Sequence, residues 1–128
     1  MATFMKPYTP QTYAALRIVT GFLFLFHGMQ KLFGIPMEGP DAPAGIIYTA
    51  GPIELIGGSL VMIGLLTRWA AFISSGLMAA AYWIAHGLQA LFPLQNGGEL
   101  AALYCFVFLF IAANGAGIWS VDAAREGV

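Results

Sequence analysis

Four long apolar segments, separated by short polar or proline-containing connections, constrain this chain more than any other feature. They cover residues 13–33, 46–66, 69–92 and 100–121. Each is close to the roughly 20 residues that an α-helix needs to cross the hydrocarbon core of a bilayer. Because only 9% of the residues are charged, against roughly 25% in soluble domains, a soluble fold would lack the polar surface to cover such a core. We therefore predict one all-α domain over residues 1–128, a four-transmembrane-helix antiparallel bundle.

The basic residues predict the orientation of this bundle. One expected end carries most of them: Lys6, Arg17, Arg68 and Arg125. Since Lys and Arg collect on the cytoplasmic side of membrane proteins, we expect both termini in the cytoplasm and interpret Arg17 and Arg68 as topology determinants. Arg17 is also a candidate ligand of lipid headgroups. The first apolar segment ends at residues 27–31 without a small-residue cleavage site, so we expect a retained membrane helix rather than a signal peptide.

Composition also excludes some classes of function. The net charge is −1 and there is no basic run, so nucleic-acid binding has no electrostatic basis. The single cysteine, Cys105, cannot form an internal disulfide or a CxxC motif. We expect it to be an inert buried thiol.

Six polar residues stand out because they fall in the outer halves of the expected helices or at their outer ends: His27, Lys31, Glu54, His86, Gln89 and Glu99. Polar and ionisable groups inside a membrane are costly and usually mark a functional site or a buried pair. The turn before the fourth helix offers Asn96 as an N-cap, with Glu99 in the first helical turn.

Helical periodicity places these residues on faces that also carry small residues, and such faces allow helices to approach closely. The face on the first helix comprises Arg17, Thr20, Gly21, Phe24, His27, Gly28 and Lys31. On the second helix, Glu54 shares a face with Gly51, Gly57, Gly58 and Val61. The face on the third helix comprises Ser75, Ala79, Tyr82, His86 and Gln89. We expect these faces to turn inward, so that their polar side chains converge.

The convergence allows several interpretations. We expect Lys31 to pair with Glu54, since the pair offsets the cost of burying either charge alone. This pair either fixes the helix register or belongs to a ligand or proton-handling cluster. His27 and His86 either make local hydrogen bonds or flank the pair in that cluster. A haem held by the two histidines, or a metal held by His27, His86 and Glu54, is a lesser alternative, and neither is expected.

Several motifs resemble the DoxX family of bacterial membrane proteins. The similarity lies in residues 17–34, in Glu54-Leu-Ile-Gly-Gly, and in residues 64–68, 92–99 and 113–120. It extends over about residues 12–123. The resemblance implies a four-helix bacterial inner-membrane protein of the kind linked to membrane oxidoreductase complexes, after a subunit of an archaeal thiosulfate:quinone oxidoreductase. The family pattern matches His27, Gly28, Lys31, Glu54, Arg68, Asn96 and Glu99, and it supplies no catalytic mechanism.

Two functional hypotheses follow. The first is a small redox-associated subunit that binds a quinone or another small molecule in the outer half of the bundle. Such a subunit is not expected to be catalytic on its own, and its electrons would come from a membrane or periplasmic oxidoreductase. The second is a non-enzymatic membrane scaffold or assembly factor in which Lys31 and Glu54 form a structural ion pair. Either protein could form a homo-oligomer in the lipid bilayer.

Overall fold

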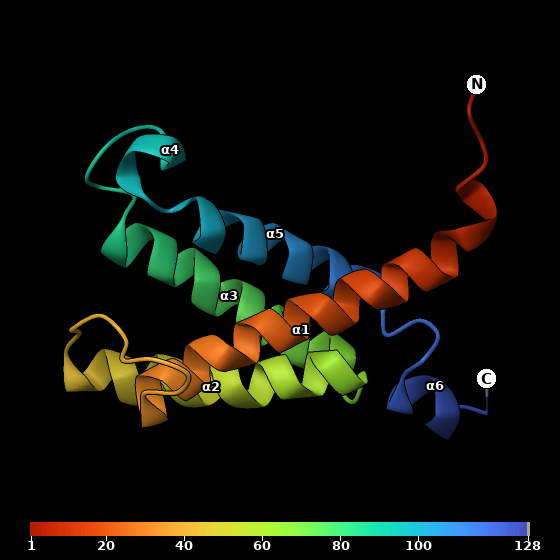
Figure 1. The fold of residues 1–128 in the computed structure, drawn as a ribbon, viewed down its shortest axis with the longest axis horizontal. Coiled ribbons are helices and arrows are strands. Elements are labelled where there is room, and N and C mark those ends of the chain that lie inside the picture. The colour runs from red at the N-terminus through yellow and green to blue at the C-terminus, as the bar shows by residue number, and fades with distance from the viewer. Residues whose placement is uncertain (128) are drawn as a thin grey trace.

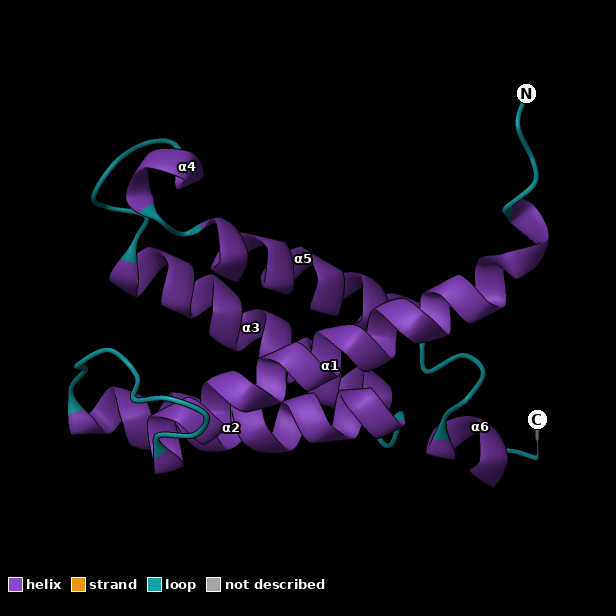
Figure 2. Cartoon of the chain, viewed as in Figure 1, coloured by secondary structure: helices purple, strands orange, loops and turns teal. Residues whose placement is uncertain are grey.

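The computed structural model describes residues 1–127 and contains helices but no strands in that range (Figures 1 and 2). Its long helices are α1 (Thr9–Phe33), α2 (Ala44–Ile63), α3 (Thr67–Ala85) and α5 (Glu99–Asn114). Three short helices are η1 (Lys6–Tyr8), α4 (Pro93–Asn96) and α6 (Val121–Arg125). The all-α prediction is confirmed within this range, whereas Val128, the last residue of the predicted domain, lies outside the described residues.

The long helices run back and forth along the longest axis of the molecule, as Figure 1 shows. Both ends of the chain lie near the turn that joins α2 to α3, which we call the basic end. The α1–α2 loop and α4 lie at the opposite end, which we call the outer end. Two helical stretches, residues 6–33 and α2, are long and apolar enough to cross a membrane, and α5 is a shorter apolar helix. Four crossings remain a prediction.

The helices end earlier than the apolar segments in two places. We predicted helix up to residue 92, but α3 ends at Ala85. Gly87 follows the C-cap residue His86. Phe92 precedes a proline, which disfavours the helical conformation and leaves Phe92 extended. His86 and Gln89 therefore lie beyond α3 rather than on it.

The fourth apolar segment is also only partly helical. We predicted helix up to residue 121, but α5 ends at Asn114. Gly115 and Gly117 have φ angles of 93° and 71°, which are left-handed conformations that favour glycine and stop a helix. A smaller correction concerns the α2–α3 turn, which we placed at residues 67 and 68. Residues 64–66 make this turn, and α3 begins at Thr67.

The helices pack as two pairs, α1 on α2 and α3 on α5, which are joined mainly through α2 and α3. Glycines let α1 and α2 approach closely. A Cβ atom on Gly21 would lie 2.6 Å from the Gly58 carbonyl oxygen, and one on Gly28 would lie 2.6 Å from the Gly51 carbonyl oxygen. The predicted inward face of α2 is buried, and so is most of that of α1. Aromatic and aliphatic residues continue the core toward α5: Phe24, Val61, Tyr104, Phe108 and Ile111.

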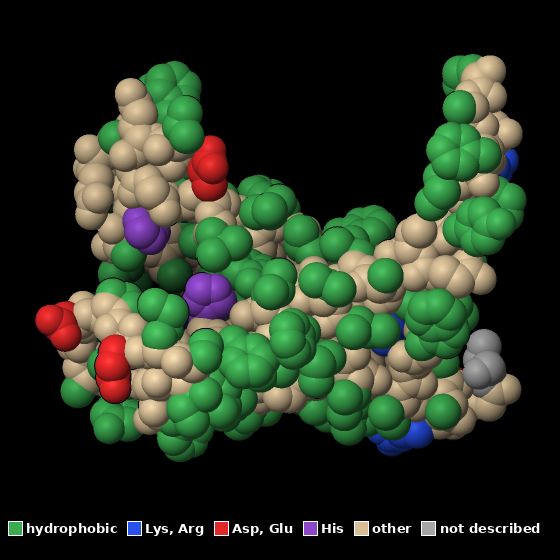
Figure 3. All heavy atoms as spheres, in the orientation of Figure 1, with side chains coloured by type: hydrophobic (Ala, Val, Ile, Leu, Met, Phe, Trp, Pro, Cys, Tyr) green, Lys and Arg blue, Asp and Glu red, His purple; other side chains and the backbone are tan. Residues whose placement is uncertain are grey.

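Large apolar side chains cover the outside of the molecule. Phe22, Phe72, Leu103 and Phe106 are about half exposed or more, at 49%, 58%, 63% and 68%. Figure 3 shows such side chains spread over the length of the helices, with charged groups gathered toward the two ends. Soluble monomers rarely expose apolar surface on this scale, so this surface is typical of a protein that contacts lipid.

Candidate functional site

A cavity of about 570 Å³ lies in the outer half of the molecule, lined by all four long helices. Its walls are mostly apolar and include Ile46, Met78 and Ala81. Four of the six polar residues predicted for the cluster also line it: His27, Lys31, Glu54 and His86. Figure 3 shows the hollow on the face that carries the two histidines. An apolar cavity with a few converging polar groups is the usual form of a small-molecule site.

Lys31 and Glu54 form an ion pair across α1 and α2. The Lys31 Nζ atom lies 3.0 Å from Oε1 and 2.9 Å from Oε2 of Glu54. The Glu54 side chain is only 4% exposed and that of Lys31 is 22% exposed. Both carboxylate oxygens are thereby bonded and the two charges compensate each other, which is what burial of a charged pair requires. The pair holds α1 and α2 together at one wall of the cavity.

The two histidines approach the cavity from different elements. His27 lies in α1, with its ring edge-on to the Tyr104 ring at a centroid separation of 5.9 Å. His86 is the C-cap residue of α3, and its Nδ1 atom lies 3.0 Å from the Asn96 carbonyl oxygen. Local bonding therefore fixes His86 in place. His27 has no hydrogen-bond partner among residues 1–127 and is free to bind a ligand.

Asn96 organises the connection above the cavity. Its amide nitrogen donates to the Tyr82 hydroxyl and to the Ala90 carbonyl, and its side-chain oxygen accepts from the Gly98 amide. The prediction that Asn96 is the N-cap of the fourth helix is wrong, because Gly98 holds that position and Asn96 ends α4. Its side chain closes the turn between α4 and α5 instead. The first residue of α5 is Glu99, as predicted.

Two predicted members of the cluster lie away from the cavity. Gln89 is exposed and donates a hydrogen bond to the Ala85 carbonyl oxygen at 2.8 Å. Glu99 is also exposed. Neither side chain lines the cavity. The break in the helix after Ala85, which periodicity did not reveal, removes Gln89 from the face on which we placed it.

The histidines and carboxylates do not form a metal-binding group. Across residues 1–127, no three His, Cys, Asp or Glu side chains are grouped in a way that could hold a metal ion. His27, His86 and Glu54 line the same cavity, yet Glu54 is engaged by Lys31 and His86 by Asn96. The geometry therefore offers no support for the metal alternative.

Tyr104 is the cavity residue that sequence reasoning missed. It lies on α5, is 7% exposed, and packs against Phe24 and Phe108 at ring-centroid distances of 5.1 and 5.8 Å. The available signal was a tyrosine about one helical turn into the fourth apolar segment, on the same side as the predicted polar cluster.

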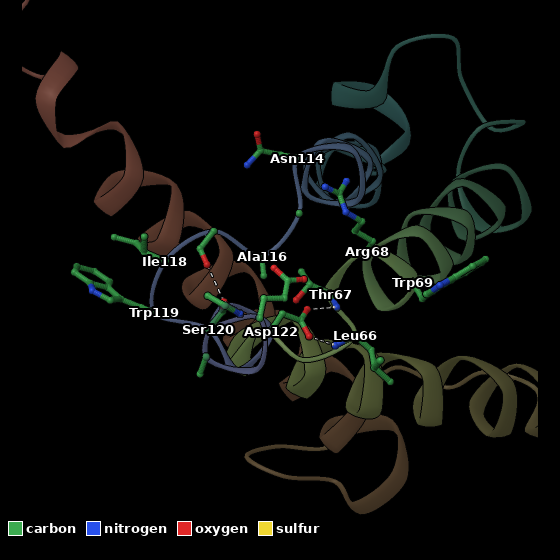
Figure 4. A pocket seen from close by; sticks show the side chains of 15 residues that line it. Leu66, Thr67, Arg68, Trp69, Asn114, Ala116, Ile118, Trp119, Ser120 and Asp122 are labelled. Carbon is green, nitrogen blue, oxygen red and sulfur yellow. Dashed lines mark hydrogen bonds between the residues drawn. The ribbon is translucent and has the colours of Figure 1, made fainter. Parts of the chain in front are cut away.

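A second cavity, of about 730 Å³, lies at the basic end (Figure 4). Asp122 and Arg68 in its lining are bonded to backbone, whereas the buried Thr67 hydroxyl has no partner among residues 1–127. The Asp122 carboxylate accepts hydrogen bonds from the Leu66 and Thr67 amides, both at 3.0 Å, as the dashed lines in Figure 4 show. Arg68 donates to the Ala112 and Ala113 carbonyl oxygens at the end of α5. Because these groups hold elements of the fold together, the outer cavity is the better candidate site.

The hydrogen bonds to Asp122 also set its acidity. Burial alone would raise the pKa of Asp122. The hydrogen bonds from the Thr67 and Leu66 amides and the nearby Arg125 together outweigh that effect, so the pKa lies below its usual value. The carboxylate thus takes the role of a cap for α3, supplied from a distant part of the chain.

Arg17 is fully buried at the basic end. Its Nε atom donates to the Val61 carbonyl oxygen at 3.1 Å, and its terminal nitrogens donate to the carbonyl oxygens of Ala116, Ile118 and Trp119. The prediction that Arg17 binds lipid headgroups is therefore wrong, because the segment after α5 folds over the guanidinium and occupies its donors. Hydropathy alone did not reveal that non-helical backbone follows Asn114.

Comparison with known proteins agrees with the membrane character of the chain. The DoxX family model matches residues 12–87. A Haemophilus influenzae protein described as uncharacterized is 42% identical over 125 residues, covering 92% of this chain and 93% of that protein. "Putative oxidoreductase CatD" of Bacillus subtilis is 32% identical over 84% of this chain and 81% of its own length. An uncharacterized membrane protein of Mycobacterium tuberculosis is 25% identical over 88% of this chain and 80% of its own length. No solved structure gives a significant match.

The family match covers more than half of the chain, and two of these relatives are more than 30% identical over most of it. The apolar exterior and the long apolar helices agree with a place in a bilayer. The chain is a membrane protein and belongs to the DoxX family.

Proposed function

We propose that this protein is a small redox-associated membrane subunit that binds a quinone, or a similar ring compound, in the outer cavity. The observation that carries the proposal is the cavity itself, in which apolar walls surround His27, His86 and the Lys31–Glu54 pair. The relative in Bacillus subtilis whose name contains "oxidoreductase" supports a redox context.

The residues suit this chemistry in distinct ways. The apolar walls accommodate a lipophilic ring, and His27 offers a ring nitrogen as a hydrogen-bond donor to a carbonyl oxygen. Reduction of a quinone to a quinol takes two electrons and two protons. Histidine suits proton transfer because its ordinary pKa lies near neutrality. The electrons come from a partner oxidoreductase, since this chain has one cysteine and no cofactor motif.

Direct binding tests the proposal. Purified protein in nanodiscs is titrated with decylubiquinone, and we expect saturable binding that His27→Ala and Glu54→Gln weaken by roughly tenfold, the effect of losing one good interaction. Gln89→Ala and Glu99→Gln are the matched controls, because these residues lie at the same end but outside the cavity. Equally weak binding by the wild type and all four variants would refute the proposal.

A scaffold or assembly role is the second candidate, favoured by the ion pair itself. Lys31 and Glu54 join α1 to α2, so the pair could serve only to fix helix register. The charge-reversed double variant Lys31→Glu/Glu54→Lys separates the two functions. If the pair is purely structural, the double variant recovers the stability lost in either single variant and supports growth as the wild type does. If the pair belongs to a ligand site, stability recovers but quinone binding does not.

We also propose the topology predicted from the charges, with four crossings of the bacterial inner membrane and both termini in the cytoplasm. The short length of α5 is compatible with crossing because carbonyl oxygens of the non-helical backbone beyond Asn114 accept hydrogen bonds from Arg17. Asp41→Cys and Glu126→Cys, each in a Cys105→Ser background, place single thiols at the two ends. In intact spheroplasts a membrane-impermeant maleimide should label position 41 and not position 126. Labelling of both, or of 126 alone, contradicts the topology.

A further inference from the structure

Tyr104 occupies a distinctive place in the outer cavity. It comes from α5, opposite the α1–α2 wall that carries the ion pair, and it lines the cavity together with His27 and Glu54. Phe24 and Phe108, which also pack against each other, contact its ring at centroid distances of 5.1 and 5.8 Å. The ring is more than nine-tenths buried. A side chain packed in this way has a fixed direction, so its hydroxyl is a fixed group of the cavity.

The hydroxyl of Tyr104 has no hydrogen-bond partner among residues 1–127. Other half-buried tyrosines of the chain are bonded: Tyr13 donates to the Gly115 carbonyl oxygen, and Tyr82 accepts from Asn96. Buried tyrosine hydroxyls usually find a partner, because leaving one unbonded in an apolar setting is costly. The missing partner of Tyr104 is therefore expected inside the cavity that it lines.

The charges in the cavity indicate what kind of partner this is. Among residues 1–127, Lys31 is the only Lys or Arg that lines the cavity. Both oxygens of Glu54 compensate its charge, which disfavours an anionic ligand. The polar groups of the cavity without a partner among residues 1–127 include the Tyr104 hydroxyl and the His27 ring, which lie next to each other. Neutral donors in apolar surroundings match a neutral acceptor oxygen, such as a carbonyl on a ring.

We infer that Tyr104 is a ligand-positioning residue whose hydroxyl donates a hydrogen bond to a carbonyl oxygen of a neutral ring compound in the outer cavity. The inference rests on the proposed function and adds to it a specific residue and a specific ligand atom. His27 contacts the same end of the ligand from α1. The Lys31–Glu54 pair lines the same cavity, with its two charges compensating each other.

A pair of ring compounds tests this assignment. One is 2,3-dimethyl-1,4-naphthoquinone, and the other is 2,3-dimethylnaphthalene, which has the same fused ring without the carbonyls. Tyr104→Phe removes only the hydroxyl and keeps the ring packing. Tyr48→Phe is the matched control, because Tyr48 is 72% exposed and does not line the cavity. Affinities are measured in nanodiscs, and unfolding of each variant is recorded alongside.

We expect Tyr104→Phe to weaken binding of the naphthoquinone by roughly tenfold, the effect of one hydrogen bond to a fixed donor. Its affinity for dimethylnaphthalene and its stability should stay unchanged, and Tyr48→Phe should match the wild type throughout. Unchanged naphthoquinone binding by Tyr104→Phe overturns the inference and leaves the proposed function standing, with water as the partner of the hydroxyl. An equal loss of affinity for both compounds would assign Tyr104 a packing role and would also overturn the inference. No binding of either compound by the wild type refutes the proposed function itself.

Discussion

Replacing Arg17 with lysine tests how the basic end is held together. If Arg17 serves the fold mainly through its positive charge, Arg17→Lys should leave stability unchanged. The structure indicates another role, since the guanidinium donates to carbonyl oxygens on α2 and on the segment after α5. Lysine carries its donors on a single nitrogen, whereas arginine spreads five over a planar fork. A lysine at position 17 therefore cannot reach carbonyls on both sides of the guanidinium.

The size of the effect follows from these contacts. Hydrogen bonds that involve a charged group contribute about 1.5–3 kcal/mol each. The acceptors of Arg17 are the carbonyls of Val61, Ala116, Ile118 and Trp119. If the lysine keeps the hydrogen bonds to the segment after α5 and loses the one to the Val61 carbonyl oxygen, Arg17→Lys should cost about 2 kcal/mol. Arg17→Met removes every donor and leaves four carbonyl oxygens without one, at about 1–3 kcal/mol each, so it should cost about 4 kcal/mol or more.

Equilibrium unfolding in mixed dodecylmaltoside and SDS micelles measures both variants. Arg125→Lys provides the matched control, because the same chemical change is made at the same end on an exposed side chain. We expect the control to unfold with the wild type and Arg17→Lys to unfold at a lower SDS fraction. Coincident curves for Arg17→Lys and Arg125→Lys would show that charge alone matters at position 17 and would refute the bridging role.

Two further predictions concern helix contacts. Gly21→Ala should destabilise the protein by about 2 kcal/mol or more, because its Cβ would lie 2.6 Å from the Gly58 carbonyl oxygen and α1 would have to move away from α2. The control Gly76→Ala, whose Cβ meets nothing within 4 Å, should be neutral or slightly stabilising in the same unfolding assay. Equal stability of the two variants would contradict the close approach of α1 and α2. Asp122→Ala should cost about 1 kcal/mol at neutral pH through the loss of the cap on Thr67 and the start of α3. Because the folded-state pKa of Asp122 lies below its ordinary value of 3.8, this contribution is fully present above that value and is lost as the pH falls through the folded-state pKa. Unfolding curves for the wild type and Asp122→Ala should converge on acidification, and a constant gap between them would contradict the assigned role.

Helix periodicity was a reliable guide in the first half of the chain. The inward faces of α1 and α2 follow the 3.6-residue repeat because both helices are continuous through the apolar segments. A regular helix maps sequence spacing directly onto direction, so Lys31 and Glu54 could be expected on facing sides. Hydropathy and periodicity together were sufficient to predict that pair.

In the second half the same reasoning failed where the backbone leaves the helix. An apolar segment remains apolar whether or not it is helical, so hydropathy alone did not reveal the helix ends at Ala85 and Asn114. Gly87, Gly115 and Pro93 were local indications of those ends. The partners of Arg17 could not be predicted, because its acceptors are backbone carbonyls and these have no residue-type signature.

The contrast between the two ends of the molecule explains why the cavity forms at the outer end. At the basic end a short turn joins α2 to α3, and Arg17, Arg68 and Asp122 tie the two helix pairs and the segment after α5 to one another through backbone groups. At the outer end, no hydrogen bond among residues 1–127 joins the two pairs. The Lys31–Glu54 bridge lies within the α1–α2 pair, and the Asn96 network lies within the α3–α5 pair. The two helix pairs are therefore joined at the basic end and can lie farther apart at the outer end, where the cavity is found. A ligand that hydrogen-bonds to His27 on α1 and to Tyr104 on α5 would join the two pairs at the outer end. Ligand binding and the stability of the outer half are therefore coupled, and a bound quinone should raise the resistance of the protein to unfolding.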